Sequence, residues 1–224
     1  MPPERGRTYG VDGKDRWRTF RSRIAVPYQF RLEQAAGPAL SILDVGCGDD
    51  SPLKLFRRTG RRVGVDAYEP AINRSREAGI HDEYRLSDVL RIGELFPRGS
   101  FEVVVAFDVL EHLERQDGLR LLAAMEQIAA RRVVVFTPNG FVSQGERGGN
   151  PWQVHRSGWT PGALRQLGYQ VSGVHGLRML RGEEAQVRWQ PHRFWHLVSD
   201  LSEPVVARFP ALAYQVIAAK DTNP

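Results

Sequence analysis

The chain has 224 residues, which suits one domain with a full hydrophobic core, and we do not expect a second independent domain. Its formal net charge of +5 comes mostly from scattered arginines, which is typical of a solvated basic surface rather than a nucleic-acid groove. One cysteine excludes an intramolecular disulfide, and no apolar run of membrane-spanning length or signal peptide is visible, so we expect a soluble, cytoplasmic protein with no membrane partner.

The N-terminal part divides into an arm and the start of the domain. Residues 1–15 mix prolines, glycines and charges, which predicts a flexible arm, and residues 16–224 are then one domain. From Trp17 to Leu32 apolar side chains recur at helical spacing, interrupted at Pro27. We expect two short helices flanking a sheet there.

A glycine turn follows the first expected strand, residues 39–45. Gly46 and Gly48 lack a Cβ, so the backbone can approach a ligand closely. Ser51 is a suitable N-cap with a proline behind it, which predicts a helix over residues 51–59. Strand, glycine turn and helix together form the cofactor-cradling unit of doubly wound folds.

The charges at this turn limit the ligand. Ser51 stands where a dinucleotide fingerprint needs its third glycine, and Asp49 and Asp50 stand where a pyrophosphate would lie. Like charges at that range oppose binding. S-adenosylmethionine carries ammonium and sulfonium groups and no phosphate, so it would tolerate these acids.

Further strands are expected in chain order, with acids at their carboxyl ends. A second strand, residues 62–66, ends at Asp66, which follows Gly46 at the spacing where an acid meets a ribose diol. A helix follows over residues 70–79, and a third strand, 84–86, leads to Asp88. A turn acid is the alternative role for Asp88.

The central part of the chain predicts a buried parallel sheet. Residues 101–107 are an apolar, β-branched run, as expected for a strand covered on both faces. Residues 118–130 have the apolar spacing of an amphipathic helix, and 132–136 form a fifth strand. Its end, residues 137–140, turns toward the edge where the other strands end.

Three segments carry a family resemblance. Residues 44–48, 63–66 and 107–113, read as Asp-Val-Gly-Cys-Gly, Val-Gly-Val-Asp and Phe-Asp-Val-Leu-Glu-His-Leu, resemble the first, second and fourth motifs of class I S-adenosylmethionine-dependent methyltransferases of the small-molecule type. Many members carry Gly-x-Gly-x-Gly, and Asp50 replaces the last glycine here. The resemblance implies an α/β fold: a doubly wound, Rossmann-like, seven-stranded, mostly parallel sheet with helices on both faces, a small cap and an antiparallel last strand.

The resemblance also implies S-adenosylmethionine as cofactor and S-adenosylhomocysteine as product. Asp88 would accept a hydrogen bond from the adenine amino group, and Val89 would pack near the base. The implied cofactor contacts are Asp44, Gly46, Cys47, Gly48, Asp66, Ala67, Tyr68, Asp88, Val89 and Asp108.

The C-terminal part contains two expected insertions. Residues 141–160 are too long for an ordinary connection, and their tryptophans and histidine argue against disorder, so we expect a substrate-covering loop. Residues 177–210 form the second covering insertion, helical over 194–209 with a break at Pro204. A helix over 160–167, a sixth strand over 169–174 and a closing strand over 213–220 complete the fold, the last lying between the fifth and sixth strands in the resembled family.

Two histidines are candidates for proton removal from a hydroxyl acceptor. An imidazole suits this task at neutral pH, and His112 follows the fourth strand whereas His155 lies in the long loop. His112 could instead be a cofactor-wall residue, and His155 could bind substrate or serve structure. The candidate substrate contacts are Asn139, Trp152, His155, Arg156 and Trp159.

The leading hypothesis is therefore a small-molecule methyltransferase, most plausibly acting on oxygen. A methyltransferase of RNA or another macromolecule is the alternative, although Asp-Val-Leu-Glu at residues 108–111 differs from the Asn-Pro-Pro-Tyr of many nitrogen methylases. A non-catalytic cofactor-binding protein is the third. We expect neither a nucleic-acid partner nor a metal, since no cysteine or histidine cluster has ligand spacing. A monomer and a homodimer both remain open.

Overall fold

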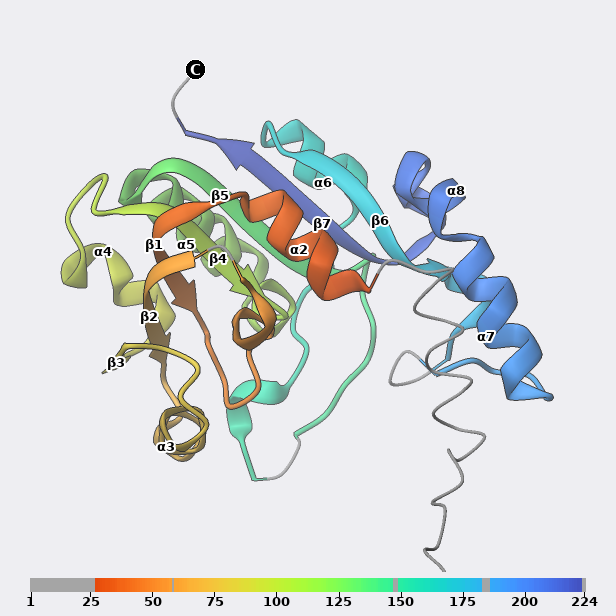
Figure 1. Cartoon of the computed structure of the whole chain (residues 1–224), viewed down its shortest axis with the longest axis horizontal. Helices are drawn as coiled ribbons and strands as arrows, with labels where there is room; N and C mark the ends of the chain where they lie inside the picture. Colours follow the sequence, from red (N-terminus) through yellow and green to blue (C-terminus); the bar gives the residue numbers. More distant parts are fainter. Residues whose placement is uncertain (1–26, 58, 147–148, 183–185, 223–224) are drawn as a thin grey trace, which may run out of the picture.

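The sheet is the centre of the molecule (Figure 1). A computed structural model describes residues 27–57, 59–146, 149–182 and 186–222. The predicted arm, residues 1–15, and the expected helix from Trp17 lie outside the described residues. The strands are β1 (Ala39–Val45), β2 (Thr59–Asp66), β3 (Glu83–Leu86), β4 (Phe101–Phe107), β5 (Ala129–Pro138), β6 (Gln170–Leu177) and β7 (Ala213–Asp221).

The strand order confirms the predicted fold class. The seven strands lie in the order β3-β2-β1-β4-β5-β7-β6. Strands β1 to β5 are all parallel to one another, whereas β7 is antiparallel to both β5 and β6. The carboxyl ends of β1, β2 and β4 consequently meet at one edge, beside the place where the strand order reverses, and this is where doubly wound sheets bind ligands.

Helices cover both faces of the sheet. They are α2 (Tyr28–Ala36), α3 (Glu69–Glu77), α4 (Ile92–Leu95), α5 (Arg115–Ile128), α6 (Pro161–Gln166), α7 (His192–Leu201) and α8 (Glu203–Arg208). Side chains alternate along each strand, so Leu43 and Val45 join a core beneath α5 while Ile42 joins a second core beneath α2. In the described part of the chain, no helix has the length and apolar character needed to cross a bilayer.

The predicted helix over residues 51–59 is wrong. A single 3-10 turn, η1 (Pro52–Leu55), replaces it, and the chain is extended again at Phe56. Phe56 turns into the core beneath α2, and Thr59 already pairs with Ala39 of β1, so no room remains for a helix. The predicted cap is confirmed, because Ser51 Oγ accepts a hydrogen bond from the amide of Leu53 at 3.2 Å.

Two further boundaries differ from the prediction. Helix α5 begins at Arg115, earlier than predicted, and the break expected at Pro204 falls at Ser202, between α7 and α8. Pro204 instead stands in the first turn of α8, where a helix needs no amide hydrogen.

Candidate active site at the carboxyl edge of the sheet

Two cavities open side by side at the carboxyl edge of the sheet. The first has a volume of about 340 Å³ and is bordered by the ends of β2 and β3; the second has about 680 Å³ and lies under residues 142–155. The two share a wall formed by Gly46, Gly48, Asp49, Asp108, His112 and Gln153. A ligand filling the first cavity would therefore border on a ligand in the second.

The glycine turn forms the floor of both cavities. Gly46 and Gly48 have φ of 69° and 56°, a region that side-chain-bearing residues rarely adopt. A Cβ on Gly46 would lie 2.6 Å from Cγ2 of Val109, so only glycine fits there. Cys47, buried beside the turn, lines the second cavity. The amide of Gly48 donates to Asp66 Oδ2 at 2.9 Å, which joins the turn to the end of β2.

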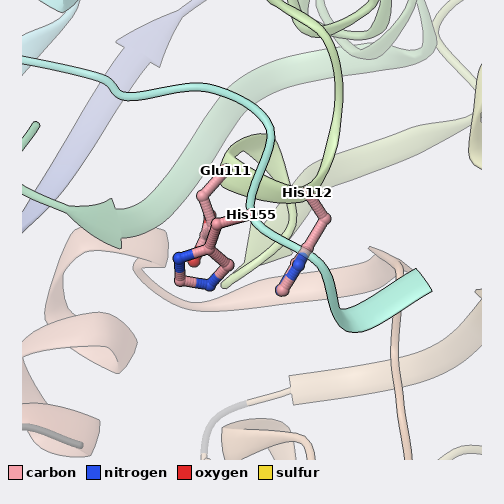
Figure 2. A group of neighbouring side chains, drawn as sticks. All are labelled: Glu111, His112 and His155. Carbon is pink, nitrogen blue, oxygen red and sulfur yellow. The ribbon is translucent and has the colours of Figure 1, made fainter. Parts of the chain in front are cut away.

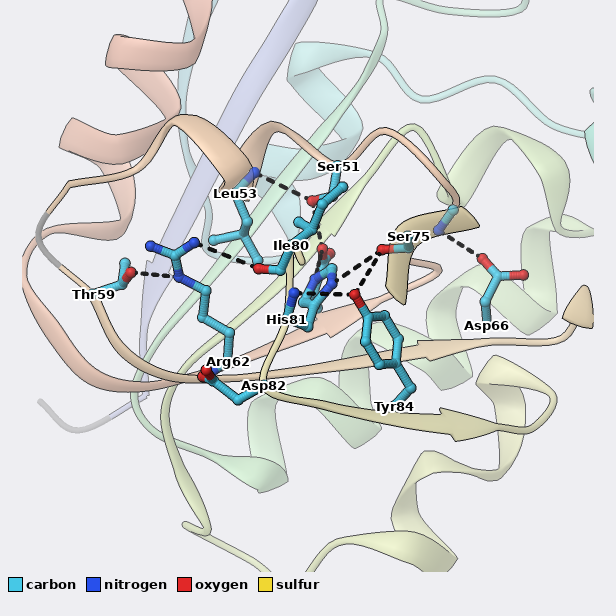
Figure 3. Close-up of polar contacts among 12 residues, drawn as sticks. Ser51, Leu53, Thr59, Arg62, Asp66, Ser75, Ile80, His81, Asp82 and Tyr84 are labelled. Carbon is cyan, nitrogen blue, oxygen red and sulfur yellow. Dashed lines mark hydrogen bonds and ion pairs between the residues drawn. The ribbon is translucent and has the colours of Figure 1, made fainter. Parts of the chain in front are cut away.

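A buried polar network supports the turn from behind (Figure 3). Asp44 Oδ2 accepts a hydrogen bond from Ser51 Oγ at 2.5 Å and pairs with Nε2 of His81 at 2.8 Å. On the far side of the imidazole, Ser75 Oγ lies 3.4 Å from His81 Nδ1, and the amide of His81 donates to the hydroxyl of Tyr84 at 3.1 Å. Asp44, expected as a cofactor contact, thus lies behind the turn and lines neither cavity.

Asp66 and Asp88, two carboxylates expected to contact the cofactor, line the first cavity together with Ala67, Tyr68 and Val89. Asp66 accepts one backbone hydrogen bond on each oxygen, from Gly48 and from Tyr68 at 2.8 Å. Burial raises the pKa of Asp66, and these donors lower it. Asp88 uses one oxygen to cap the turn after β3, accepting from Leu90 at 2.9 Å. Both roles considered for Asp88 are compatible with this geometry.

The two acids at the glycine turn, which were expected to oppose a pyrophosphate, are both paired with cations. Asp49 forms an ion pair with Arg74 at 2.7 Å, and both line the first cavity. Asp50, which replaces the usual third glycine, pairs with Lys54 one turn further on. The glycine turn therefore does not carry two uncompensated charges.

Two neighbouring acids, Asp108 and Glu111, follow the end of β4. Glu111 is 2% exposed, and burial together with the charge of Asp108 raises the pKa of Glu111 well above its usual value. Asp108 faces the open cavities, where water can reach it, so we assign the proton to Glu111, whose carboxyl donates to Asp108. Thr137 Oγ1 donates to Glu111 Oε2 at 2.9 Å.

The side chain of Asp108 is held by a chain of hydrogen bonds from β7 and β6. Gln215 Nε2 donates to Asp108 Oδ1 at 3.0 Å, so the amide oxygen of Gln215 faces Nδ1 of His175 at 2.5 Å and accepts its hydrogen. The backbone of Asp108 has φ of 54°, and its amide donates to Phe136 at 2.8 Å. The carboxylate is thereby held at the wall between the cavities.

The two candidate histidines meet over the second cavity (Figure 2). Their rings lie edge to face with centroids 4.7 Å apart. Each Nδ1 donates to a carbonyl of the long loop: His112 to Val154 at 3.3 Å and His155 to Val142 at 2.6 Å. Burial, and then the charge of His155, lower the pKa of His112 to about 4.

A carboxylate and two imidazoles form a possible cation site here. One ligand atom each of Glu111, His112 and His155 lies within 4.8 Å of the other two. This set resembles the donors that divalent transition metals accept. A cation would first have to displace the proton that Glu111 shares with Asp108, because metal ligands must be deprotonated.

Three expected substrate contacts are placed elsewhere. Trp159 is fully buried in the core beneath α5, where its indole donates to the carbonyl of Leu110 at 3.1 Å. Asn139 is buried and its amide donates to three backbone carbonyls, those of Pro210, Ala211 and Ala213. Arg156 is exposed and lines neither cavity. The side chains of Trp159 and Asn139 are thus satisfied inside the protein, and none of the three residues lines either cavity.

The long loop covers the cavities and the second expected insertion does not. Trp152 and Gln153 line the first cavity, and residues 142–146 with His155 line the second. None of the described residues from 177 to 210 borders either cavity. Sequence reasoning missed Arg74, Gln153 and Gln215, which lie in or beside the site but carry no local motif, and it gave no role to Glu111 within the motif at residues 107–113.

Comparisons with known proteins agree with this geometry. The family model described as "Methyltransferase domain" matches residues 43–136. A ubiquinone biosynthesis O-methyltransferase of Hahella chejuensis is 32% identical over 102 residues; the alignment covers 43% of this chain and 42% of the relative, so the chain matches less than half of the relative's length.

Two solved structures share the fold over nearly the whole chain. A SAM-dependent methyltransferase from Archaeoglobus fulgidus has a TM-score of 0.55 at 15% identity, covering 92% of this chain and 94% of its own. The N-methyltransferase NodS from Bradyrhizobium japonicum, in complex with S-adenosylhomocysteine, also has a TM-score of 0.55 at 15% identity, covering 96% and 90%. At this identity the likeness supports the fold.

Proposed function

Because residues 43–136 are a methyltransferase domain of the class I, S-adenosylmethionine-dependent type, we propose that the chain transfers a methyl group to an oxygen atom of a small-molecule acceptor. One observation carries this proposal: the two cavities share the wall at Gly46, Asp108 and His112. A cofactor in the first cavity would have its reactive end at that wall, facing an acceptor in the second.

The first cavity fits the cofactor on this chain's own geometry. Gly48 has open space where a Cβ would stand, Gly46 packs its Cβ-free side against Val109, and both glycines line the first cavity. Asp66 retains lone pairs beyond its two backbone donors, and these suit the two hydroxyl hydrogens of a ribose. The second oxygen of Asp88 suits an adenine amino group, and Asp108 suits the ammonium group.

When bound, S-adenosylmethionine supplies an electrophilic methyl carbon attached to a sulfonium sulfur. The chain's task is to hold an acceptor oxygen in line with the carbon–sulfur bond, and such positioning can supply roughly 7–11 kcal/mol. Transfer of this carbon to the acceptor oxygen would leave the sulfur as a neutral thioether, and the acceptor proton would pass to a base of the chain. The walls of the second cavity, from residues 138–146 and 214–215, hold the acceptor in this arrangement.

His155 is the residue we assign to the acceptor proton. Its Nδ1 hydrogen is fixed on the carbonyl of Val142, so Nε2 is the basic nitrogen. His155 lines only the acceptor cavity, whereas His112 borders both cavities. The pKa of His112 is lowered to about 4, far from the neutral range in which a catalytic base works best. His112 then serves as a wall between cofactor and acceptor.

Two further points support oxygen as the acceptor atom. The matched relative from Hahella chejuensis is named an O-methyltransferase. A hydroxyl acceptor must lose its proton as it is methylated, and the second cavity contains an imidazole placed for that step.

Calorimetric titration with S-adenosylmethionine and S-adenosylhomocysteine tests the cofactor. Micromolar binding of both is expected, followed by methyl release in a screen across phenols, sugar hydroxyls, carboxylates and amines. Turnover with amines alone would contradict the oxygen assignment. Binding without turnover on any acceptor class would favour a non-catalytic cofactor-binding protein.

A further inference from the structure

Helix α7 is oriented with its polar side inward. Ser199 is fully buried and Asp200 is 6% exposed. Ser202 and Glu203, which follow α7, also point their side chains toward the protein. The apolar side faces outward, because Phe194 is 53% exposed and Leu201, seven residues later, is 59% exposed. A helix on a protein that is surrounded only by water ordinarily shows the opposite arrangement.

Specific contacts fix this orientation. Arg181 Nη2 donates to Ser199 Oγ at 2.9 Å. Glu203 accepts from the amide of Gly176 at 2.6 Å and pairs with Arg31 at 3.1 Å. The polar side is therefore tied to β6 and α2, and the apolar side cannot rotate inward without breaking these bonds.

The exposed apolar side extends beyond α7. We define the α7–α8 surface as Trp189, Phe194, Leu201, Val205 and Phe209, all of which are more than 40% exposed. Trp195 packs against it, with ring centroids 4.8 Å from Trp189 and 5.2 Å from Phe194. Both helices lie at the end of the sheet beyond β6, away from α3 and α4 (Figure 1).

The described exposed charges along residues 186–212 have one sign. Arg188, Arg193 and Arg208 are exposed beside it. The acids between residues 186 and 212 are Asp200 and Glu203, and both are turned inward. Glu183 and Glu184 lie outside the described residues. Every exposed charged side chain of residues 186–212 is thus an arginine.

We propose that the α7–α8 surface binds the face of an anionic phospholipid bilayer. Helices that bind at a membrane interface typically expose tryptophan and phenylalanine beside arginine. The aromatic side chains enter the headgroup region, and the arginines pair with lipid phosphates. A second copy of the chain is a poorer occupant, because a two-fold contact would place these arginines against each other with no exposed acid in the described part of the surface. The expectation of no membrane partner rested on spanning segments alone, and an interfacial helix needs none.

The position of the surface gives it a relation to the site. The chain leaves α8, passes the exposed Leu212, and lines the second cavity at Tyr214 and Gln215. A bilayer bound to the α7–α8 surface would therefore lie on the acceptor side of the enzyme.

Vesicle flotation of the full chain tests the proposal, independently of methyl transfer. Vesicles of phosphatidylcholine with 30% phosphatidylglycerol are compared with phosphatidylcholine alone at about 50 and 500 mM salt. We expect flotation with the anionic vesicles, weakened by salt. Arg193→Gln with Arg208→Gln should weaken binding about 25-fold, at about fivefold for each arginine. Phe194→Ser with Leu201→Ser should weaken it at least tenfold.

The matched control replaces exposed leucines elsewhere. Leu40 and Leu95 are 78% and 41% exposed on other elements, so Leu40→Ser with Leu95→Ser should float like the unaltered chain. Circular dichroism and thermal unfolding confirm that each variant folds. No flotation at low salt would overturn the proposal, as would equal binding to neutral vesicles. A dimer in light scattering that the Phe194→Ser, Leu201→Ser variant dissociates would identify a second copy as the occupant.

Discussion

The cofactor side and the acceptor side of the candidate site differ in how their charged groups are satisfied. On the cofactor side, Asp66 and Asp88 have fixed backbone donors, and Asp49 has Arg74. On the acceptor side, burial raises the pKa of Glu111, and two imidazoles lie 4.7 Å apart. Carboxylates held by fixed donors or by a cation suit binding, whereas an imidazole suits proton movement near neutral pH. The first side is built to hold a ligand and the second to perform chemistry.

Replacing His155 tests the chemical side most strongly. His155→Gln should lower kcat by about 10²–10⁴, because the acceptor proton loses its base, while the affinity for S-adenosylhomocysteine changes little. His112→Gln should cost less in kcat and more in cofactor affinity, since His112 borders both cavities. Steady-state kinetics and calorimetry separate the two effects.

The control for this pair is His192→Gln, an exposed histidine at the start of α7 that lines neither cavity. Its kinetics should match those of the unaltered chain. A larger loss of kcat in His112→Gln than in His155→Gln would reverse the assignment of the base.

Replacing Asp66 tests the binding side. Asp66→Ala should weaken S-adenosylhomocysteine binding by about 10²-fold, because hydrogen bonds to a charged group contribute about 1.5–3 kcal/mol each. Glu83→Gln, on the neighbouring strand and partly exposed, is the control and should bind normally. Unchanged affinity in Asp66→Ala would remove Asp66 from the cofactor site.

Replacing His81 tests how the binding side is held. His81→Ala removes a donor from the buried Asp44, and we expect the free energy of unfolding to fall by about 2 kcal/mol in urea titrations. Cofactor affinity should fall with it, because Asp44 and Ser51 support the glycine turn. Ser75→Ala removes a 3.4 Å contact to His81 and a 3.1 Å contact to the hydroxyl of Tyr84 but no hydrogen bond to Asp44, so it should cost less. Equal losses in the two variants would show that the His81–Asp44 pair has no special part.

The sequence predicts the cofactor side better than the acceptor side, for a physical reason. Gly46, Gly48, Asp66 and Asp88 each stand at the end of a strand, and parallel strands bring their carboxyl ends together without further information. The acceptor side is assembled from residues 108–112, 142–155 and 214–215, which are distant in the chain. Only the folded loop shows that His155 faces the cavity while Trp159 enters the core.

Burial explains the remaining differences. Asn139 and Trp159 have side chains of the kind that bind substrates. Their backbones, however, form a β-bridge with each other, and their side-chain donors bond to backbone carbonyls inside the protein. His81 gives no local signal because its partner Asp44 is 37 residues away. The helix expected after Ser51 fails because strand pairing at Thr59 and burial of Phe56 override local propensity.

The smallest expected effect concerns Glu111, and it sharpens the contrast between the two sides. A raised pKa means that the folded state holds a proton that the unfolded state has released, so the stability from this group is present below about pH 4.5 and is lost as pH rises through the raised pKa. Glu111→Gln keeps a neutral donor of the same shape. It should flatten this part of the pH dependence in urea titrations and leave kcat within about threefold. Dialysis against a chelator should then change turnover as little as the substitution does. A loss of turnover above tenfold in Glu111→Gln, matched by chelation and restored by a divalent cation, would instead make Glu111, His112 and His155 a metal centre.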